Sequence, residues 1–223
     1  MGKDKSNELK KLYNKDYVDK FQFQDPNRIK RLLNLIAFNA KDLVLDIGCG
    51  DGALSAYIHN EIKEYIGLDF SENFVERAND LRHFDNVRFV CSELSQFSKV
   101  SNEKFDKIFL LDISEHVFDD EFIDILRAAK SLLNQSGKIY IHTPNGDYLI
   151  EQLKDWGILK QFPEHVAVRN YKEYRHLLKK ADIFNVEVKF LAHYDKLLKN
   201  FHFLSFIPFL GRFFKARIFL ICG

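Results

Sequence analysis

From residue 41 onward the chain alternates short apolar runs with amphipathic stretches, and this alternation restricts the fold more than any other feature. The apolar runs are Leu43–Ile47, Tyr65–Leu68, Val87–Val90, Phe105–Leu111 and Lys138–His142. Their nearly continuous apolar character is typical of parallel strands buried on both faces. Helical patterns lie between them at about 52–60, 71–82 and 119–134, with Gly137 expected in the loop after the last helix. This spacing predicts βαβ units in a doubly wound sheet.

Three further elements are expected near the carboxyl end. Residues 171–181 have a helical pattern, Phe184–Phe190 alternates apolar with polar residues, and Arg217–Cys222 is an apolar run. Two late strands of this kind are compatible with a terminal antiparallel pair. We therefore expect an α/β fold with a mostly parallel seven-stranded sheet, helices on both faces and an antiparallel C-terminal strand.

Composition excludes several classes of protein. The 223 residues carry a formal net charge of +1, so the chain as a whole has no strong positive field that would attract nucleic acid. Cys49, Cys91 and Cys222 are too far apart for a cysteine metal site or a disulfide framework, so a reducing cytoplasm is expected. No secretory signal and no apolar run long enough to cross a membrane are found in the sequence. The oligomeric state is left open.

A glycine-rich loop follows the first predicted strand. Its sequence from Val44 to Gly52 is VLDIGCGDG, and Asp69 follows at the end of the second predicted strand. Glycines allow a tight turn and a close ligand approach, and a carboxylate at this strand end can accept ribose hydroxyls. A dinucleotide site has G-x-G-x-x-G, whereas this loop has G-x-G-x-G with Asp46 just before it. A carboxylate there favours the cationic S-adenosylmethionine over a pyrophosphate, which leaves nicotinamide oxidoreduction as a distant alternative.

Residues 41–190 resemble class I S-adenosylmethionine-dependent methyltransferases, which have a Rossmann-like fold. The resemblance rests on the glycine loop, on GLDFS at 67–71, on FVCSEL at 89–94, on FDKI at 105–108 and on 133–144. In the third motif Glu93 stands where an aspartate that meets the adenine amino group is more usual. The resemblance implies cofactor contacts from Asp46, Gly48, Gly50, Asp69, Phe70, Glu93, Leu94 and Leu111.

The same resemblance gives residues 1–40 a role. Amino-terminal helices often cover the cofactor in this superfamily, so residues 1–40 are expected to form a helical lid. Residues 41–223 would form the S-adenosylmethionine-binding part of what is a single domain overall. Tyr13 and Tyr17 are four residues apart on one helix face. They either line the substrate cavity or belong to the core.

The segment Asp112-Ile113-Ser114-Glu115-His116 follows the fourth predicted strand, where ligands bind in open α/β sheets. It is similar to the E-x-x-E-H of ubiquinone-type O-methyltransferases and of small-RNA 2′-O-methyltransferases. That similarity implies a divalent metal, Mg²⁺ or Mn²⁺, held by Asp112, Glu115, His116 and the downstream His165. A metal polarises a hydroxyl for attack on the methyl group. Asp112 is one methylene shorter than the family's glutamate, so His116 as a metal-free base and a structural role stay open.

Residues 201–217 combine many phenylalanines with Arg212, Lys215 and Arg217 and contain no acid. This pattern fits a membrane-surface element, which would make the protein peripheral to a membrane. It also fits a hairpin insertion over the last strands or a dimer surface.

The sequence therefore predicts methyl transfer to a hydroxyl oxygen of a small-molecule or lipid-linked acceptor, with His116 as the catalytic residue. Methylation of an RNA 2′-hydroxyl and a catalytically silent cofactor-binding scaffold are the alternatives.

Overall fold

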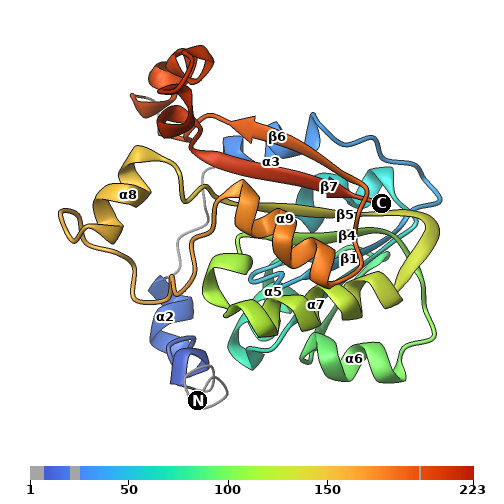
Figure 1. The fold of residues 1–223 in the computed structure, drawn as a ribbon. Coiled ribbons are helices and arrows are strands. Elements are labelled where there is room, and N and C mark those ends of the chain that lie inside the picture. The colour runs from blue at the N-terminus through green and yellow to red at the C-terminus, as the bar shows by residue number, and fades with distance from the viewer. Residues whose placement is uncertain (1–7, 21–25, 196) are drawn as a thin grey trace. The chain divides into compact units, whose positions relative to one another are not determined.

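The computed structural model describes residues 8–20, 26–195 and 197–223. Contacts within the chain gather in two compact units (Figure 1). Unit 1 runs through Leu110 and also includes Ala128–Ile139, and unit 2 consists of Leu111–Arg127 and Tyr140–Gly223. The seven strands have the order β3-β2-β1-β4-β5-β7-β6. This arrangement confirms the predicted mostly parallel seven-stranded sheet.

Unit 1 contains the parallel strands that are followed in the chain by the glycine loop and by the later motifs. These strands are β1 (Leu43–Ile47), β2 (Glu64–Asp69), β3 (Val87–Cys91) and β4 (Phe105–Leu111), whose last residue belongs to unit 2. β1 pairs in parallel with β2 and β4, and β2 pairs in parallel with β3. In this register Asp46 lies opposite Gly67 of β2. The acidic residue before the glycine loop thus lies beside the second motif.

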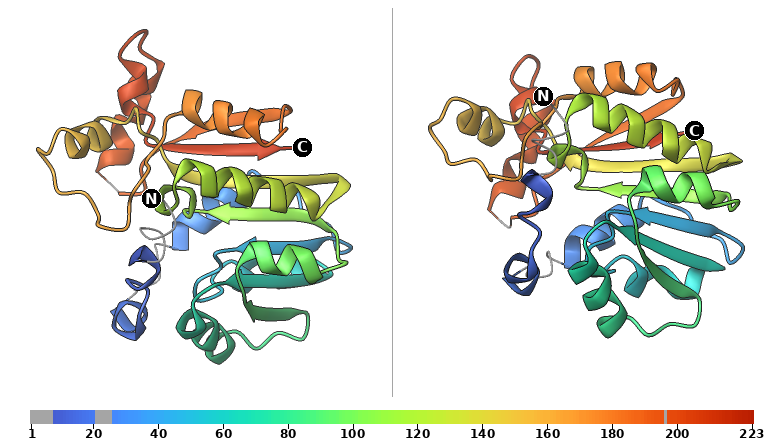
Figure 2. Two further views of the ribbon diagram at one scale, coloured as in Figure 1. Left: turned by 60° about the horizontal axis from the view of Figure 1, so that its bottom comes forward. Right: turned by 90° about the horizontal axis from the view of Figure 1, so that it is seen from below.

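Helices and a buried apolar core support these strands. The helices are α4 (Ser55–Ile58), η1 (His59–Glu61), α5 (Glu72–Leu81) and α6 (Leu94–Val100), and α5 packs against β2 and β3 (Figure 2). Val44, Leu45, Ile108 and Leu110 are completely buried. Continuous burial of successive strand residues is what a sheet covered on both faces requires.

Unit 2 contains the two late strands and the helices around them. Its elements are η2 (Ser114–His116), the start of α7 (Asp119–Ser131), the end of β5 (Leu133–Pro144), α8 (Leu149–Asp155), α9 (Tyr171–Lys180), β6 (Val186–Leu191) and β7 (Arg217–Cys222). Asn170 and Glu173 form a capping box that starts α9. β6 and β7 pair antiparallel, from Val186 opposite Cys222 to Leu191 opposite Arg217. The predicted terminal antiparallel pair is confirmed.

Some expected boundaries differ from those of the structure. The helix expected over 119–134 ends at Ser131, and Gly137 lies inside β5 rather than in a loop. A Cβ at Gly137 would stand 2.8 Å from the carbonyl oxygen of Phe105, so the glycine permits a close approach of backbone. The helix expected at 52–60 is one short turn followed by the 3₁₀ turn η1.

The amino-terminal region contains α2 (Lys15–Lys20) and α3 (Pro26–Leu33). Residues 1–7 and 21–25 of the expected 1–40 lid lie outside the described residues, so the lid stays a prediction. Between β6 and β7 the chain forms two 3₁₀ segments, η3 (Leu198–Phe206) and η4 (Gly211–Phe214). Within the described ranges, no helix is both long and apolar enough to cross a membrane.

Candidate functional site

The glycine loop leaves β1 in a backbone conformation that favours glycine. Gly48, Gly50 and Gly52 have φ angles of 68°, 54° and 71°, in the left-handed region that side chains with a Cβ rarely adopt. The amides of Gly48 and Cys49 both donate to the carbonyl oxygen of Leu68, at 2.7 and 3.1 Å. These bonds fix the loop to the end of β2, one residue before Asp69.

Gly50 and Gly52 lack a side chain for different reasons. A Cβ on Gly52 would stand 2.4 Å from the ring of Phe89, so this position is needed for packing. A Cβ on Gly50 would find only the ring of Phe74, at 4.0 Å. Among the described residues, the space beside Gly50 is therefore not filled by close packing and can receive a ligand.

Asp69 joins the loop to the second motif. Its Oδ2 accepts from the Gly50 amide at 3.0 Å and its Oδ1 from the Ser71 amide at 2.9 Å. Burial raises the pKa of Asp69, while these backbone bonds lower it. An ionised carboxylate has about four acceptor positions, so two such bonds leave capacity for the two hydroxyls of a ribose.

Asp46 is buried beneath the loop and faces a phenol. The hydroxyl of Tyr65 donates to its Oδ2 at 2.5 Å. Burial raises the pKa of Asp46 to about 7, against the lowering effect of the Tyr65 bond and with a smaller raising effect from Asp69. A nearby cation such as an ammonium group favours the ionised form. The protonation state of Asp46 can therefore change when a cationic ligand binds.

The remaining cofactor candidates of unit 1 contact the amino-terminal segment. The ring of Tyr13 meets those of Tyr17 and Phe70 edge-on, at 5.1 and 5.4 Å between centroids. Lys10 Nζ lies 2.6 Å from Oε1 of Glu93, the residue just before α6. Leu94, the first residue of α6, is buried, whereas Phe70 and Glu93 are exposed. Tyr13 therefore contacts the second motif, Tyr17 packs against Tyr13 and Phe74, and the predicted contact of both with substrate stays a prediction.

Leu111 and Asp112 begin unit 2 at the end of β4. Asp112 has a φ of 53° and donates its amide to the carbonyl of His142. Its Oδ1 lies 2.9 Å from His142 Nδ1 and accepts from Arg217 at 3.2 Å. The Asp112 carboxylate thus contacts His142 and Arg217, and the metal-ligand role expected of Asp112 stays a prediction.

The other three predicted ligands come together. One ligand atom from each of Glu115, His116 and His165 lies within 4.8 Å of the others. The carbonyl oxygen of Glu115 accepts from the amides of Val166 and Ala167, at 2.9 and 3.1 Å. These two bonds hold the segment after His165 against η2, which explains how residues about 50 positions apart meet.

Both imidazoles of this group are held in the neutral form. His116 Nδ1 lies 3.1 Å from the carbonyl oxygen of Glu164, so Nδ1 carries the proton and Nε2 is the unprotonated nitrogen. Burial lowers the pKa of His116. Burial, with a smaller effect from His116, lowers the pKa of His165 to about 4. In the described part of the chain, the buried Nδ1 of His165 has no hydrogen-bond partner.

This donor set fits a divalent metal. A buried carboxylate with two neutral imidazoles is a ligand combination that Mn²⁺ and other transition metals accept. The buried Nδ1 of His165, without a partner among the described residues, is an observation of this structure that a metal would satisfy.

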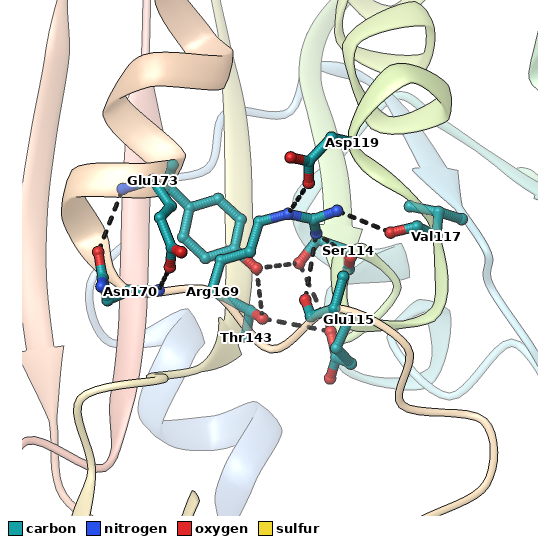
Figure 3. Close-up of polar contacts among 10 residues, drawn as sticks. Ser114, Glu115, Val117, Asp119, Thr143, Arg169, Asn170 and Glu173 are labelled. Atoms are coloured by element: carbon teal, nitrogen blue, oxygen red, sulfur yellow. Dashed lines mark hydrogen bonds and ion pairs between the residues drawn. The ribbon is translucent and has the colours of Figure 1, made fainter. Parts of the chain in front are cut away.

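Arg169 braces the turn that carries Glu115 and His116 (Figure 3). Its buried guanidinium donates to the carbonyl oxygens of Ser114 at 2.5 Å, Val117 at 2.7 Å and Ala167 at 3.2 Å. It also bonds Asp119 at 2.8 Å. Three carbonyl bonds and one carboxylate bond from a rigid fork fix the backbone on both sides of the group.

A hydroxyl cluster holds the Glu115 side chain. Thr143 donates to Glu115 Oε2 at 3.2 Å, and the Tyr174 hydroxyl lies 2.8 Å from Ser114 Oγ and 3.0 Å from Thr143 Oγ1 (Figure 3). Burial raises the pKa of Tyr174 to about 12, so the phenol stays protonated. The cluster supplies donors to a carboxylate that is only 1% exposed.

Sequence reasoning missed these supporting residues. Arg169 is separated from Ser114 by 55 positions, and its one local signal is its place before the Asn170 capping box. His142, the last residue of the predicted strand Lys138–His142, was given no role, yet it contacts Asp112 and the hydroxyl of Tyr194. A histidine within a buried strand needs partners, and this was the available signal.

Known proteins match this arrangement. A family model described as a methyltransferase domain matches residues 21–188. The ubiquinone biosynthesis O-methyltransferase of Coxiella burnetii is 27% identical over 126 residues, which cover 56% of this chain and 52% of that protein. The Aliivibrio fischeri enzyme of the same name is 28% identical over 131 residues, with 56% and 55% covered. The chain thus spans about half the length of the curated relatives it matches.

Solved structures agree on the fold. A SAM-dependent methyltransferase from Archaeoglobus fulgidus has a TM-score of 0.67 at 19% identity, with 88% of this chain and 92% of that chain covered. A structure titled as a DhpI-SAM-HEP complex has a TM-score of 0.67 at 15% identity and covers 97% of both chains. With its Rossmann-like sheet, its glycine loop and a family match over most of its length, the chain belongs to the methyltransferase-domain family.

Proposed function

We propose that this protein transfers the methyl group of S-adenosylmethionine to a hydroxyl oxygen of a small-molecule or lipid-linked acceptor. The observation that carries the proposal is the grouping of Glu115, His116 and His165, with ligand atoms within 4.8 Å. Glu115 and His116 come shortly after β4 in the chain. The identity of the curated relatives as O-methyltransferases supports oxygen as the acceptor atom.

The cofactor side rests on unit 1. Gly50 offers space beside a bonded loop, and Asp69 retains acceptor positions for a ribose. S-adenosylmethionine supplies a methyl carbon made electrophilic by its sulfonium. Positioning contributes most of the rate in such a transfer, because in-line alignment replaces a bimolecular encounter.

His116 acts as the base. Its Nδ1 proton is committed to the Glu164 carbonyl, so Nε2 accepts the hydroxyl proton of the acceptor. The oxygen lone pair forms the new bond to the methyl carbon, and the electrons of the sulfur–carbon bond return to sulfur. The lowered pKa of His116 keeps the imidazole neutral and ready for this proton at physiological pH.

Glu115, His116 and His165 would hold a divalent metal. A bound Mg²⁺ or Mn²⁺ supplies Lewis-acid polarisation of the hydroxyl. In that case His116 is a ligand and the base is a different group, so the two roles of His116 exclude one another. The experiment below separates them.

The test combines calorimetry with methyl transfer. We expect the purified chain to bind S-adenosylmethionine and S-adenosylhomocysteine with micromolar affinity. Radiolabelled methyl transfer to catechols and to a detergent-solubilised lipid extract is then measured with EDTA and with added Mn²⁺. His116→Ala is expected to abolish transfer while leaving cofactor affinity unchanged, and the exposed His176→Ala serves as the matched control.

Each outcome assigns a role. Loss of transfer in EDTA with rescue by Mn²⁺, and loss of Mn²⁺ binding in His165→Ala, would support the metal-assisted form. Full activity in EDTA would leave His116 as a metal-free base. Wild-type turnover in His116→Ala would refute both forms. Cofactor binding without transfer to any hydroxyl, with transfer to RNA absent as well, would indicate a silent scaffold instead.

A further inference from the structure

The segment between β6 and β7 exposes an unusual amount of apolar surface. Figure 1 shows it standing out from the ends of these two strands in unit 2. We call residues 197–214 the aromatic insertion. Its exposed large apolar side chains are those of Leu197, Phe201, Phe203, Phe206, Ile207, Phe209 and Leu210. Monomeric proteins seldom gather exposed apolar side chains in one place without a binding role.

The aromatic insertion is a folded element, so this exposure does not come from an extended loop. Gly211 donates its amide to the carbonyl of Ile207 at 2.8 Å. A Cβ on Gly211 would stand 2.2 Å from the carbonyl oxygen of Ser205, so η4 lies directly against the end of η3. His202 Nδ1 lies 3.3 Å from the carbonyl oxygen of Phe214. The backbone is packed inward and the large side chains point outward.

The turn between η3 and η4 presents the most exposed ring. Phe209 has a φ of 63° and its side chain is 96% exposed, and that of Phe206 is 83% exposed. A bulky side chain in the left-handed region is strained, because its Cβ comes too close to the following carbonyl oxygen. A strained backbone that exposes an apolar ring to solvent does not stabilise the isolated chain. Backbone strain of this kind is a feature of ligand-binding segments.

Charge favours an anionic partner. The sequence from 196 to 223 contains no aspartate or glutamate. Arg212 is exposed and lies over the ring of Phe213, with 4.6 Å from its guanidinium carbon to the ring centroid. Lys215 lies 4.5 Å from the ring centroid of Phe190, beside the same element. Aromatic rings flanked by bases match the apolar edge and the anionic headgroups of a bilayer.

A second exposed segment accompanies it. Trp156, Ile158 and Phe162, in the chain that follows α8, are also exposed. Figures 1 and 2 draw this segment at the same end of unit 2 as the aromatic insertion. Tryptophan with aliphatic neighbours is typical of membrane-interface contacts.

The residues that flank the aromatic insertion contact β5 and the residue that follows β4. Tyr194 bonds His142, and Arg217 bonds Asp112, whose carboxylate also lies 2.9 Å from His142. Arg217 also lies over the Tyr194 ring, with its guanidinium carbon 5.1 Å from the centroid. These polar contacts thus connect the residues that flank the insertion with Asp112, which precedes Glu115 by three residues in the chain.

We propose that the aromatic insertion docks the protein on an anionic bilayer surface, with Phe206 and Phe209 entering the interface and Arg212 meeting the headgroups. The docking is independent of methyl transfer, and a protein without activity would still bind vesicles.

Flotation with vesicles tests this. The full chain is mixed with vesicles of phosphatidylcholine alone or with roughly one third phosphatidylglycerol, a strongly anionic surface. We expect the wild type to bind the anionic vesicles and to release in high salt. Phe206→Ser with Phe209→Ser should weaken binding by about tenfold or more, because both rings leave the interface. Arg212→Glu should weaken it as well.

Matched changes elsewhere in unit 2 serve as controls. Phe184→Ser removes an exposed phenylalanine outside the insertion, and Arg175→Glu reverses an exposed arginine on α9. Both should bind like the wild type, and thermal unfolding should show all variants folded. Equal vesicle binding by the Phe206/Phe209 variant, or no binding by the wild type, would overturn the proposal. A wild-type dimer that this variant converts to monomer, without vesicle binding, would identify a self-association surface instead.

Discussion

At Asp46 a carboxyl group is buried against the phenol of Tyr65, and burial raises its pKa from 3.8 to about 7. The folded state therefore holds this proton more tightly than the unfolded chain. The resulting stabilisation is complete below pH 4 and is lost as the pH rises through about 7. Between these values we expect Asp46→Asn to remove a slope of up to about 1.4 kcal/mol per pH unit from the free energy of unfolding.

Urea unfolding at a series of pH values measures this slope. The exposed Asp80→Asn in α5 is the matched change and should leave the pH dependence of the wild type intact. Identical slopes in wild type and Asp46→Asn would mean that Asp46 is ionised throughout. A cationic ligand favours the ionised form, so S-adenosylmethionine should bind more tightly at pH 8 than at pH 6 in the wild type alone.

Alanine substitutions at Gly50, Gly52 and Gly157 distinguish the effects of backbone strain, side-chain packing and loss of space for a ligand. All have positive φ. Among the described residues, an added Cβ meets Phe89 at 2.4 Å on Gly52, only Phe74 at 4.0 Å on Gly50 and nothing within 4 Å on Gly157. Alanine at Gly157 or Gly50 should cost about 1–2 kcal/mol for the left-handed backbone. Alanine at Gly52 should cost about 1–3 kcal/mol more because Phe89 must move.

Cofactor affinity distinguishes Gly50 from its control. By calorimetry, Gly50→Ala should weaken S-adenosylhomocysteine binding, while Gly157→Ala should leave it unchanged. Equal affinities in the two variants would show that the space beside Gly50 is not where the ligand lies. A Gly52→Ala protein as stable as Gly157→Ala would contradict the packing role.

At the scale of elements, Arg169 links the chain before α9 to the turn that precedes α7. Arg169→Met leaves the carbonyls of Ser114, Val117 and Ala167 without their donor. We expect a loss of about 2–4 kcal/mol, since each buried unsatisfied group costs about 1–3 kcal/mol and relaxation recovers part. Thermal and urea unfolding give this value.

A local readout shows where the loss occurs. Hydrogen exchange of the amides of Val166 and Ala167 should accelerate, because they donate to Glu115 in the braced segment. The control is Arg127→Met, whose side chain is largely exposed and donates to the carbonyl of Lys180. It should cost under about 1 kcal/mol. Similar losses in both variants would deny Arg169 its bracing role.

The elements that the sequence predicted well are those with an uninterrupted local signal. Leu43–Ile47, Phe105–Leu111 and Arg217–Cys222 were predicted with the bounds of β1, β4 and β7. The helix after Asp119 was extended too far because Leu132 and Leu133 continue its apolar pattern into β5. A helix and a buried strand cannot be told apart by such a short apolar run.

The residues of the candidate site could be predicted only where they belong to a recognisable sequence motif. Glu115, His116 and His165 came from a resemblance, and the structure brings these three together. Asp112 has a backbone in the left-handed region, and its carboxylate meets His142 and Arg217. Such contacts depend on strands distant in sequence, and residue spacing holds no information about them.

For the whole molecule, the two compact units are not separate lengths of chain. The chain passes between them within β4, within α7 and within β5. Asn134 of β5 donates to Asp106 of β4 at 2.7 Å, and both belong to unit 1. Continuous elements that cross the division three times oppose independent unfolding of either unit. We expect one cooperative transition.

Thiol labelling tests this expectation because each unit contains a buried cysteine. Cys49 lies in unit 1 and Cys222 in unit 2, and burial raises the pKa of both thiols, that of Cys222 to about 12. Neither thiol should react in the folded protein. In a Cys91→Ser background, which removes the exposed thiol, their labelling rates should rise with the same dependence on urea. Cys222 labelled at lower urea than Cys49 would show that unit 2 opens alone, and the reverse order would show the same for unit 1. Coincident curves would mean that both units unfold in one transition. A change in the aromatic insertion that destabilises unit 2 would then lower the stability of the cofactor loop equally. The effect of every variant on cofactor affinity must therefore be measured at urea concentrations well below this transition.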